Sequence, residues 1–272
     1  MYEAYWKLSQ KPFENCSDSR FYFPGESHQA ALLKLRYAIE NHRGGALLAG
    51  PPGSGKTLLV GMMRAMLGEP FSPFVHLAFP QMPTDQLLAC LACELSGKDG
   101  QRSLTVQQSV RRIERFLAEN TEQGRHAVVV LDEAHLLDDN QTLEAIRLLM
   151  NFEPAGRPGW TLLLAGQPGI LPILDRLPQL EERLGVKCLL RPFTAAETAS
   201  YVNHRLQVAG ARHAIFENES LAVLHQKTHG IARRINRLCD LALLIGFADQ
   251  RATISPAQLD AIHQELIHVA PE

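Results

Sequence analysis

Apolar residues recur along the chain with two spacings, and these predict strands and helices that alternate over residues 27–190. Short continuous apolar runs predict buried strands at residues 45–49, 74–79, 126–131, 160–165 and 185–190. Apolar residues on one side of a helical repeat predict helices at residues 27–40, 58–67, 83–95, 103–119 and 141–151. Ser27 and Thr84 are the expected N-caps of the first and third of these helices. Strands that alternate with helices are typical of a parallel sheet, so the pattern predicts an α/β fold.

The two ends of the chain follow other patterns. After residue 190 only helical spacing remains, and it predicts a small bundle of helices at residues 195–209, 219–229, 231–248 and 256–269. Residues 1–24 are rich in aromatics without a clear period, which favours a loop that packs its rings on a neighbouring site. We therefore expect three parts: an N-terminal aromatic segment and helix at residues 1–44, an α/β core at residues 45–192 and a helical lid at residues 193–272.

The composition excludes some classes of function but does not identify a single one. A hydrophobic content of 46% allows a substantial core, and a net charge of −2 does not mark a polyanion-binding protein. Five scattered cysteines favour a reducing, cytoplasmic location. Cys90 and Cys93 form a C-x-x-C pair on an amphipathic helix, where core packing is the expected role because no second pair completes a zinc site. No apolar run reaches the length of about 18 residues typical of a membrane span, and the N-terminus lacks signal-peptide features.

A glycine-rich loop follows the first predicted strand and fits G-x-x-x-x-G-K-[ST] at every fixed position. Strand, loop and helix in this order are the context that the Walker A motif requires. Its backbone N–H groups and the following helix N-terminus favour bound phosphate, its lysine reaches the β and γ phosphates, and its threonine holds Mg²⁺. The predicted nucleotide-binding residues are Gly50, Pro51, Pro52, Gly53, Ser54, Gly55, Lys56, Thr57 and Leu58.

A second motif follows the strand predicted at residues 126–131, where Asp132, Glu133, Ala134 and His135 stand in succession. An apolar strand that ends in two carboxylates is typical of Walker B. Here Asp132 is the expected Mg²⁺ ligand, and Glu133 is the expected base that takes a proton from the attacking water. A strand end exposed to solvent is the alternative for this pattern alone. Paired with the glycine-rich loop, it favours the P-loop class that uses a catalytic glutamate.

Gln167 follows the strand predicted at residues 160–165. In the P-loop class with a catalytic glutamate, the strand after Walker B is inserted between the two Walker strands. A polar side chain at its tip then faces the γ-phosphate, so Gln167 is the candidate for the sensor 1 role. The alternative is a turn glutamine before Pro168.

Taken together, these motifs resemble the ATPase domain of general secretion pathway protein A, the ExeA-like branch of the AAA+ superfamily, over nearly the whole chain. The resemblance includes both Walker motifs, the aromatic start of the chain, the segment from Glu197 to Leu206 and the stretch from Gly230 to Asp240. It implies a P-loop AAA+ core with a parallel sheet and a C-terminal helical lid. It also implies ATP and Mg²⁺ as ligands, ATP hydrolysis and a homo-oligomer.

The resemblance also assigns roles to arginines. Arg233 matches the sensor 2 arginine that reaches from the lid to the nucleotide. Arg183 matches an arginine suggestive of action on the neighbouring subunit's nucleotide, and Arg176 is the alternative candidate. Ala232 replaces a usual proline, so a less sharply fixed helix start is expected there. Asp18, Arg20 and the N-terminal aromatics either close over the nucleotide base or fill the edge of the core.

Three functions remain open at this point. The favoured one is an ATPase motor or switch that helps assemble a secretion or type IV pilus system. We expect it in the cytoplasm, or peripherally at the inner membrane. Because this sequence has no membrane span, a partner would connect it to the envelope. The second is an ATP-gated DNA-binding adaptor, which resembles transposition target-selection regulators. Residues 191–272 carry eight Lys/Arg and eight Asp/Glu, so no basic excess in the lid favours DNA. The third is an ATPase switch of unassigned role.

Overall fold

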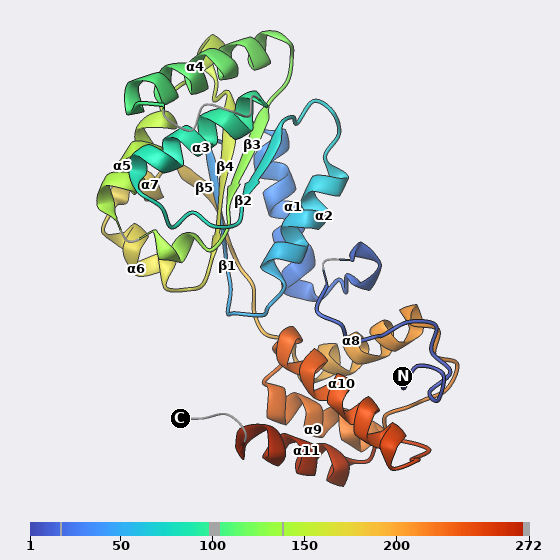
Figure 1. The fold of residues 1–272 in the computed structure, drawn as a ribbon. Helices are drawn as coiled ribbons and strands as arrows, with labels where there is room; N and C mark the ends of the chain where they lie inside the picture. The colour runs from blue at the N-terminus through green and yellow to red at the C-terminus, as the bar shows by residue number, and fades with distance from the viewer. Residues whose placement is uncertain (17, 98–103, 138, 269–272) are drawn as a thin grey trace. The chain divides into compact units, whose positions relative to one another are not determined.

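The computed structural model describes residues 1–272 apart from residues 17, 98–103, 138 and 269–272 (Figure 1). Contacts divide the chain into two compact units, and each is described by itself. The sheet unit contains residues 27–50 and 59–190, and the lid unit contains residues 1–26, 51–58 and 191–272. Both units are therefore built from segments that are discontinuous in the sequence.

The sheet unit is built on five parallel strands. They are β1 (Gly45–Ala49), β2 (Phe74–Leu77), β3 (Ala127–Leu131), β4 (Trp160–Gly166) and β5 (Leu184–Leu189). Their order in the sheet is β2-β3-β4-β1-β5, and every neighbouring pair is parallel. β4 thus lies between β1 and β3, as the motifs predict. Because the strands are parallel, the carboxyl ends of β1, β3 and β4 lie at one edge of the sheet.

Helices cover both faces of this sheet. Figure 1 shows α1 (Glu26–Glu40) and α2 (Lys56–Met66) on one face, and α3 (Thr84–Ser96), α4 (Val106–Glu122) and α5 (Asn140–Leu149) on the other. Every residue of β1, β3 and β4 is buried, which explains why their sequences are continuous apolar runs rather than alternating ones.

Several local expectations need correction. Two short helices, α6 (Ile170–Asp175) and α7 (Pro178–Glu181), were not predicted because they are too short to show a helical period. α1 begins at Glu26, one residue before the expected Ser27 cap. Thr84 does not cap α3, because its hydroxyl lies 2.7 Å from that of Thr142 and bonds there instead. α4 begins after a capping box of Thr105 and Gln108, and its expected start at residue 103 lies outside the described residues.

The lid unit contains four longer helices, each within two residues of its predicted bounds. They are α8 (Ala195–Val208), α9 (Asn218–Thr228), α10 (Ala232–Ala248) and α11 (Pro256–His268). The N-terminal segment supplies part of their core. Trp6 is only 1% exposed and donates its indole N–H to the carbonyl of Leu243, at 2.9 Å. Tyr2 and Phe13 are buried in the same cluster of apolar side chains.

A polar network joins the N-terminal segment to the lid helices. The buried Arg205 donates to the hydroxyl of Tyr201 and to the carbonyl of Glu14, each at 2.9 Å. Its guanidinium also lies 4.5 Å from the ring centroid of Phe21, in a cation–π contact. This packing supports the expectation that the N-terminal aromatics fill the core.

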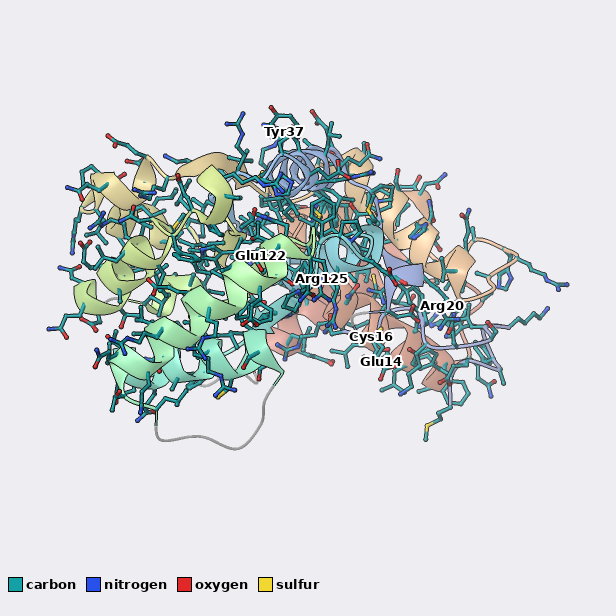
Figure 2. All side chains as sticks on the ribbon, turned by 90° about the horizontal axis from the view of Figure 1, so that it is seen from above. Glu14, Cys16, Arg20, Tyr37, Glu122 and Arg125 are labelled. Carbon is teal, nitrogen blue, oxygen red and sulfur yellow. The ribbon has the colours of Figure 1, made fainter. Side chains whose placement is uncertain are left out.

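The half-buried Asp18 and the exposed Arg20 form a pair on this segment, beside Phe21 in sequence. Asp18 caps the short 3-10 helix η1 (Ser19–Phe21) and pairs with Arg20, at 2.6 Å. The hydrogen bonds from Arg20 hold the pKa of Asp18 below its usual range. Figure 2 shows the side chain of Arg20 together with those of Glu14 and Cys16, which belong to the same segment. The role of this pair at a nucleotide base stays a prediction.

Two histidines meet at the amino edge of the sheet, the edge opposite the motifs. The Nδ1 atoms of His42 and His126 lie 2.9 Å apart, and Nε2 of His126 lies 2.8 Å from the hydroxyl of Thr161. Thr161 in turn donates to the carbonyl of Arg43, at 2.6 Å. Because one Nδ1 must accept from the other, the pair cannot have both rings charged and keep this bond. Burial lowers the pKa of His126 to about 3, and burial also lowers the pKa of His42.

This pair predicts acid sensitivity. His126 stays uncharged in the folded protein, whereas the unfolded chain takes up a proton below a pKa of about 6.5, so stability falls as the pH drops from about 6.5 to about 3. From pH 7.5 to pH 5 we expect His126 to remove about 2 kcal/mol of unfolding free energy. Urea unfolding at both pH values should show this loss, and His126→Gln should lack it. The exposed His213→Gln is the control. Equal pH dependence in wild type and His126→Gln would contradict the prediction.

Candidate functional site

The carboxyl edge of the sheet brings together the exits of three strands. In the register of the sheet, Ala49 of β1 stands beside Gly166 of β4, and Leu131 of β3 stands beside Leu164 of β4. The N–H of Gly50 donates to the carbonyl of Gly166, at 3.1 Å, which fixes where the chain leaves β1. The glycine-rich loop, the Asp132-Glu133 pair and Gln167 therefore start from adjacent strands.

The glycine-rich loop has the backbone of a phosphate-binding turn. Gly53 and Gly55 have φ values of +77° and +94°, which residues with a side chain rarely adopt. Lys56 begins α2 and is only 6% exposed; its ammonium donates to the carbonyl of Pro51, at 3.2 Å. The loop thus curls back over its own lysine, and the first N–H groups of α2 point out of the helix N-terminus toward the turn. Such a turn is a ready anion-binding site.

Arg233 is brought against this loop within the lid unit. Its backbone N–H donates to the carbonyl of Gly53, at 3.1 Å. A Cβ atom on Gly53 would lie only 2.6 Å from Cβ of Arg233, so glycine is required there for packing as well as for φ. α10 begins at Ala232 without a side-chain cap, so Arg233 lies in its first turn. The first turn of α10 therefore presents the predicted sensor 2 residue beside the loop.

The two carboxylates after β3 occupy different surroundings. Asp132 is 3% exposed; one oxygen accepts from the N–H of Glu133 at 2.9 Å, and the other lies 3.3 Å from Nε2 of His76. Glu133 has a left-handed backbone with φ of 51°, and its side chain is 44% exposed. A left-handed conformation costs energy in a glutamate and is typical of functional sites. The turn holds Asp132 in the interior and directs Glu133 toward solvent.

Two histidines that the sequence reasoning did not assign lie beside these acids. His76, on β2, contacts Asp132. His135, in the short helix η2 (Ala134–Leu136), has its Nδ1 atom 3.4 Å from a carboxylate oxygen of Glu133 and 3.4 Å from the backbone nitrogen of Gln167. The signal for His135 was its place two residues after Glu133. The signal for His76 was a polar residue in a strand that flanks the Walker B strand.

Gln167 is half-buried and follows β4 directly, between the exits of β1 and β3. This is the position that its predicted sensor role requires. The contact of its side chain with a phosphate stays a prediction.

Arg183, the favoured trans-acting arginine, lies away from this edge. Arg183 directly precedes β5, beside Gly45 at the amino start of β1, so it stands at the opposite edge of the sheet from Glu133. Arg176 is exposed at the end of α6. Glu181, two residues before Arg183, pairs with Lys187. Within one sheet unit, the fold does not bring Arg183 to the predicted base.

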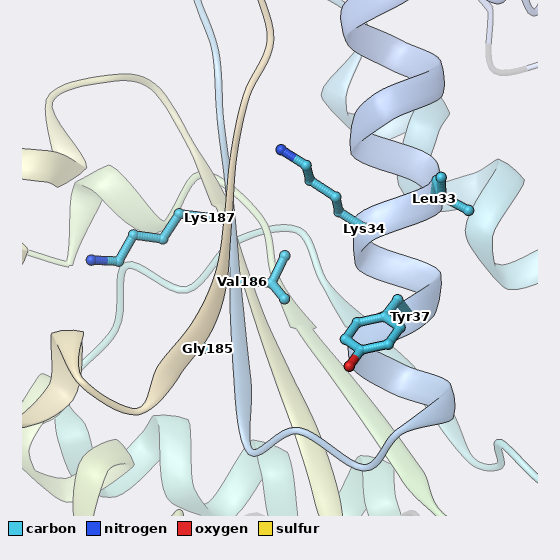
Figure 3. A pocket seen from close by; sticks show the side chains of 6 residues that line it. All are labelled: Leu33, Lys34, Tyr37, Gly185, Val186 and Lys187. Atoms are coloured by element: carbon cyan, nitrogen blue, oxygen red, sulfur yellow. The ribbon is translucent and has the colours of Figure 1, made fainter.

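A separate groove of about 590 Å³ lies between α1 and β5. Figure 3 shows it, and its lining residues are Leu33, Lys34, Tyr37, Gly185, Val186 and Lys187. This lining contains no carboxylate or histidine. It therefore lacks the acid–base groups found at the carboxyl edge of the sheet.

Two absences apply to the residues that the structure describes. Among them, no group of three or more His, Cys, Asp and Glu side chains is arranged to hold a metal ion, and neither Cys90 nor Cys93 forms a disulfide. None of the described helices combines the length and apolar character needed to cross a membrane.

The family follows from comparison of the sequence with known proteins. The AAA domain profile matches residues 39–174, which contain both Walker motifs. The chain belongs to the AAA domain family. It is 33% identical over 254 residues to general secretion pathway protein A of Aeromonas hydrophila, as expected from the motifs. That match covers 91% of this chain and 45% of the relative, so the chain spans about half of that protein's length.

Solved structures confirm the fold of this AAA domain protein. Cdc6p from Pyrobaculum aerophilum matches with a TM-score of 0.74 and 18% identity, covering 96% of this chain and 74% of that one. The ORC2 protein of Aeropyrum pernix, solved in ADPNP–ADP complexes, matches with a TM-score of 0.67 and 15% identity, covering 94% and 72%. At these identities the likeness concerns fold alone. It confirms the predicted α/β AAA+ P-loop fold.

The glycine-rich loop generates a stability prediction. We expect Gly53→Ala to lower the unfolding free energy by about 1 to 3 kcal/mol, because it combines a strained positive φ with a clash against Arg233. Gly61→Ala is the matched control, because Gly61 is exposed within α2 and an added Cβ meets nothing within 4 Å. It should stabilise the helix by about 0.5 to 1 kcal/mol. Urea unfolding of both variants tests the pair, and equal effects would refute it.

Proposed function

We propose that this AAA domain protein binds ATP with Mg²⁺, hydrolyses ATP, and acts as an oligomeric motor or switch in assembly of a secretion or type IV pilus system. The observation that carries the ATPase proposal is the divergent carboxylate pair after β3. Asp132 is buried and Glu133 is exposed, at the edge where the glycine-rich loop leaves β1. The buried Asp132 is suited to be a metal ligand, and the accessible Glu133 is suited to be a base.

The glycine-rich loop and Arg233 would hold the nucleotide. Backbone N–H groups at the turn and the start of α2 would bind phosphate oxygens, and Lys56 would exchange its bond to Pro51 for the β and γ phosphates. Arg233 would add a second positive charge from α10, where its backbone bond to Gly53 fixes its distance from the turn. These groups act by position and charge, which is the main route to catalysis of phosphoryl transfer.

Thr57 and Asp132 suit Mg²⁺ by their chemistry. A hydroxyl and a carboxylate are oxygen donors, and one or two protein ligands are enough because Mg²⁺ keeps several waters and binds phosphate oxygens. Asp132 is oriented by the N–H of Glu133, which donates to one of its carboxylate oxygens. When bound, Mg²⁺ neutralises charge on the phosphates.

Glu133 would take the proton of the attacking water. Its carboxylate is exposed and lies off the strand end, so a water molecule has access to it. Gln167 would orient the γ-phosphate or the water from the tip of β4. Water would attack phosphorus, the bond to the β-γ bridging oxygen would break, and ADP and phosphate would leave.

The proposed secretion role rests on the relative, whose name places it in general secretion. An identity of 33% over 91% of this chain supports a shared ATPase part. In this proposal the protein works in the cytoplasm or at the inner membrane through a partner, and its substrate machine is a secretion or pilus assembly. Because the chain spans about half of the relative, the partner has to be identified directly.

The roles of Lys56 and Glu133 separate in two variants. We expect Lys56→Ala to weaken ATP binding strongly, because no other described side chain reaches the turn as a buried ammonium. Glu133→Gln should retain ATP affinity and lose about 100-fold or more of turnover, since an amide cannot take a proton. Fluorescent-nucleotide titration and phosphate release measure the two effects. Lys34→Ala, an exposed lysine of the α1–β5 groove, is the control. Wild-type turnover in Glu133→Gln would remove Glu133 from the mechanism.

Oligomer formation gives a further prediction. Arg183 stands at the opposite sheet edge from its own Glu133, so its proposed target is the nucleotide of a neighbouring subunit. Turnover per subunit should rise with protein concentration. Arg183→Ala should lose about 10³-fold of the maximal rate while still binding ATP.

Mixing provides the control for this arginine. Lys56→Ala and Arg183→Ala subunits, each inactive alone, should regain part of the activity together, because some interfaces join an intact Lys56 to an intact Arg183. Arg176→Ala should keep the concentration dependence. If Arg176→Ala fails instead, the trans-acting residue is Arg176. Concentration-independent turnover in the wild type would indicate a monomeric switch.

A further inference from the structure

We propose that His135 is a positioning residue that couples Gln167 to Glu133 through a single ring nitrogen. The inference rests on the proposed function, because it concerns control of the proposed base. It adds a residue for which the sequence motifs gave no role. The observation that carries it is that one atom, Nδ1, lies 3.4 Å from both the Glu133 carboxylate and the Gln167 backbone nitrogen.

The two contacts of Nδ1 exclude each other chemically. The N–H of Gln167 is a donor, so Nδ1 can accept from it only when the nitrogen carries no hydrogen. The carboxylate of Glu133 is an acceptor, so Nδ1 can bond to it only when the nitrogen carries a hydrogen. His135 can therefore serve either Gln167 or Glu133 at one time.

The surrounding packing keeps His135 in reach of both groups. Its neighbours Ala134 and Leu137 are buried in the core of the sheet unit, and the N–H of Leu137 donates to the carbonyl of Ala134 at 3.1 Å. On the other side, a Cβ atom on Gly166 would lie 3.0 Å from the backbone nitrogen of His135. The turn after β3 is thus packed directly against the end of β4. A displacement of Gln167 must change the Nδ1 contact.

This arrangement makes the state of the base depend on the tip of β4. While Nδ1 accepts from Gln167, it offers no hydrogen to Glu133, and the carboxylate remains available to water. When Gln167 moves away, the other tautomer donates Nδ1–H to Glu133 and occupies one of its oxygens. His76 contacts Asp132 instead, so each acid has its own histidine neighbour. The rate of ATP hydrolysis would then depend on the position of Gln167, while the affinity for the nucleotide would stay the same.

Three substitutions at one position distinguish this role from simple packing. In asparagine the amide oxygen and nitrogen are bonded to Cγ, as Nδ1 is in histidine. His135→Asn therefore keeps a polar atom near the Nδ1 position. The longer glutamine places its amide near the Nε2 position, so His135→Gln loses that atom at nearly the same volume. His135→Ala removes both. A role in packing ranks the variants by volume, whereas coupling ranks them by the presence of an atom at the Nδ1 position.

The experiment measures steady-state turnover and ATP affinity for the three variants, with His213→Asn as a control at an exposed histidine. We expect turnover to fall about 10- to 100-fold in His135→Ala and His135→Gln, with ATP affinity within about twofold of wild type, because misplacing a reacting group by about 1 Å costs this much. His135→Asn should stay within about threefold. Equal losses in the Asn and Gln variants, or losses matched by weaker ATP binding, would overturn the proposal.

Two further measurements keep the result interpretable. Glu133→Gln is assayed in the same series. If this variant keeps wild-type turnover, the proposed function fails. If it loses turnover while all His135 variants keep full activity, only the coupling is refuted. Independently of variant folding, histidine ¹⁵N spectra of the wild type at pH 8 report the tautomer, and His135→Asn identifies the signal. We expect unprotonated Nδ1 without nucleotide. A hydrogen on Nδ1 in that state would contradict the assignment.

Discussion

The parallel pairing of β4 between β1 and β3 is the constraint on which the site depends. Backbone hydrogen bonds fix Gly166 beside Ala49 and Leu164 beside Leu131. Because successive strand residues point to opposite faces, a shift by one residue would move every side chain of β4 to the other face of the sheet. Since β4 is buried along its whole length, its register is set by the backbone pairing with β1 and β3 and not by an alternation of apolar and polar residues. The same register fixes where Gln167, the residue after β4, lies at the carboxyl edge.

Local backbone geometry then assigns different properties to neighbouring residues of the same type. Asp132 and Glu133 are adjacent carboxylates, yet the left-handed conformation at Glu133 keeps one in the interior and releases the other to solvent. Separation of this kind allows a single strand end to supply both a metal ligand and a base. Hydrogen bonds from the chain to Asp132 limit its movement, whereas Glu133 remains accessible.

Much of this architecture could be predicted from the sequence, because the features that determine it are local. Continuous apolar runs identified the five strands, and the glycine and acidic motifs identified which strand ends carry chemistry. The helix predicted from residue 195 begins there, after a capping box of Thr194 and Glu197. Short helices such as α7 were missed because four residues hold no period.

The contacts that were missed join residues far apart in the sequence. His76 and Asp132 are 56 residues apart, and the Arg205 contact with Glu14 spans 191. No periodicity records such pairs, since only the sheet register or the lid packing brings them together. Thr84 shows the converse case, in which a good local cap signal was overridden by a tertiary hydrogen bond to Thr142. Domain boundaries at residues 44 and 192 stay a prediction, although contacts group the first 26 residues with the last helices.

The bond between Trp6 and Leu243 has a consequence for synthesis on the ribosome. Its two partners are 237 residues apart, and a chain grows at roughly 5 to 20 residues per second, so Trp6 waits roughly 10 to 50 s for its acceptor. During that interval the sheet unit can already be complete, since its last residue is Leu190. The aromatic N-terminus, by contrast, remains without its native core until the final helices emerge. The core of the lid unit can therefore form only after α10 has been synthesised, although residues 1–26 of that unit are made first.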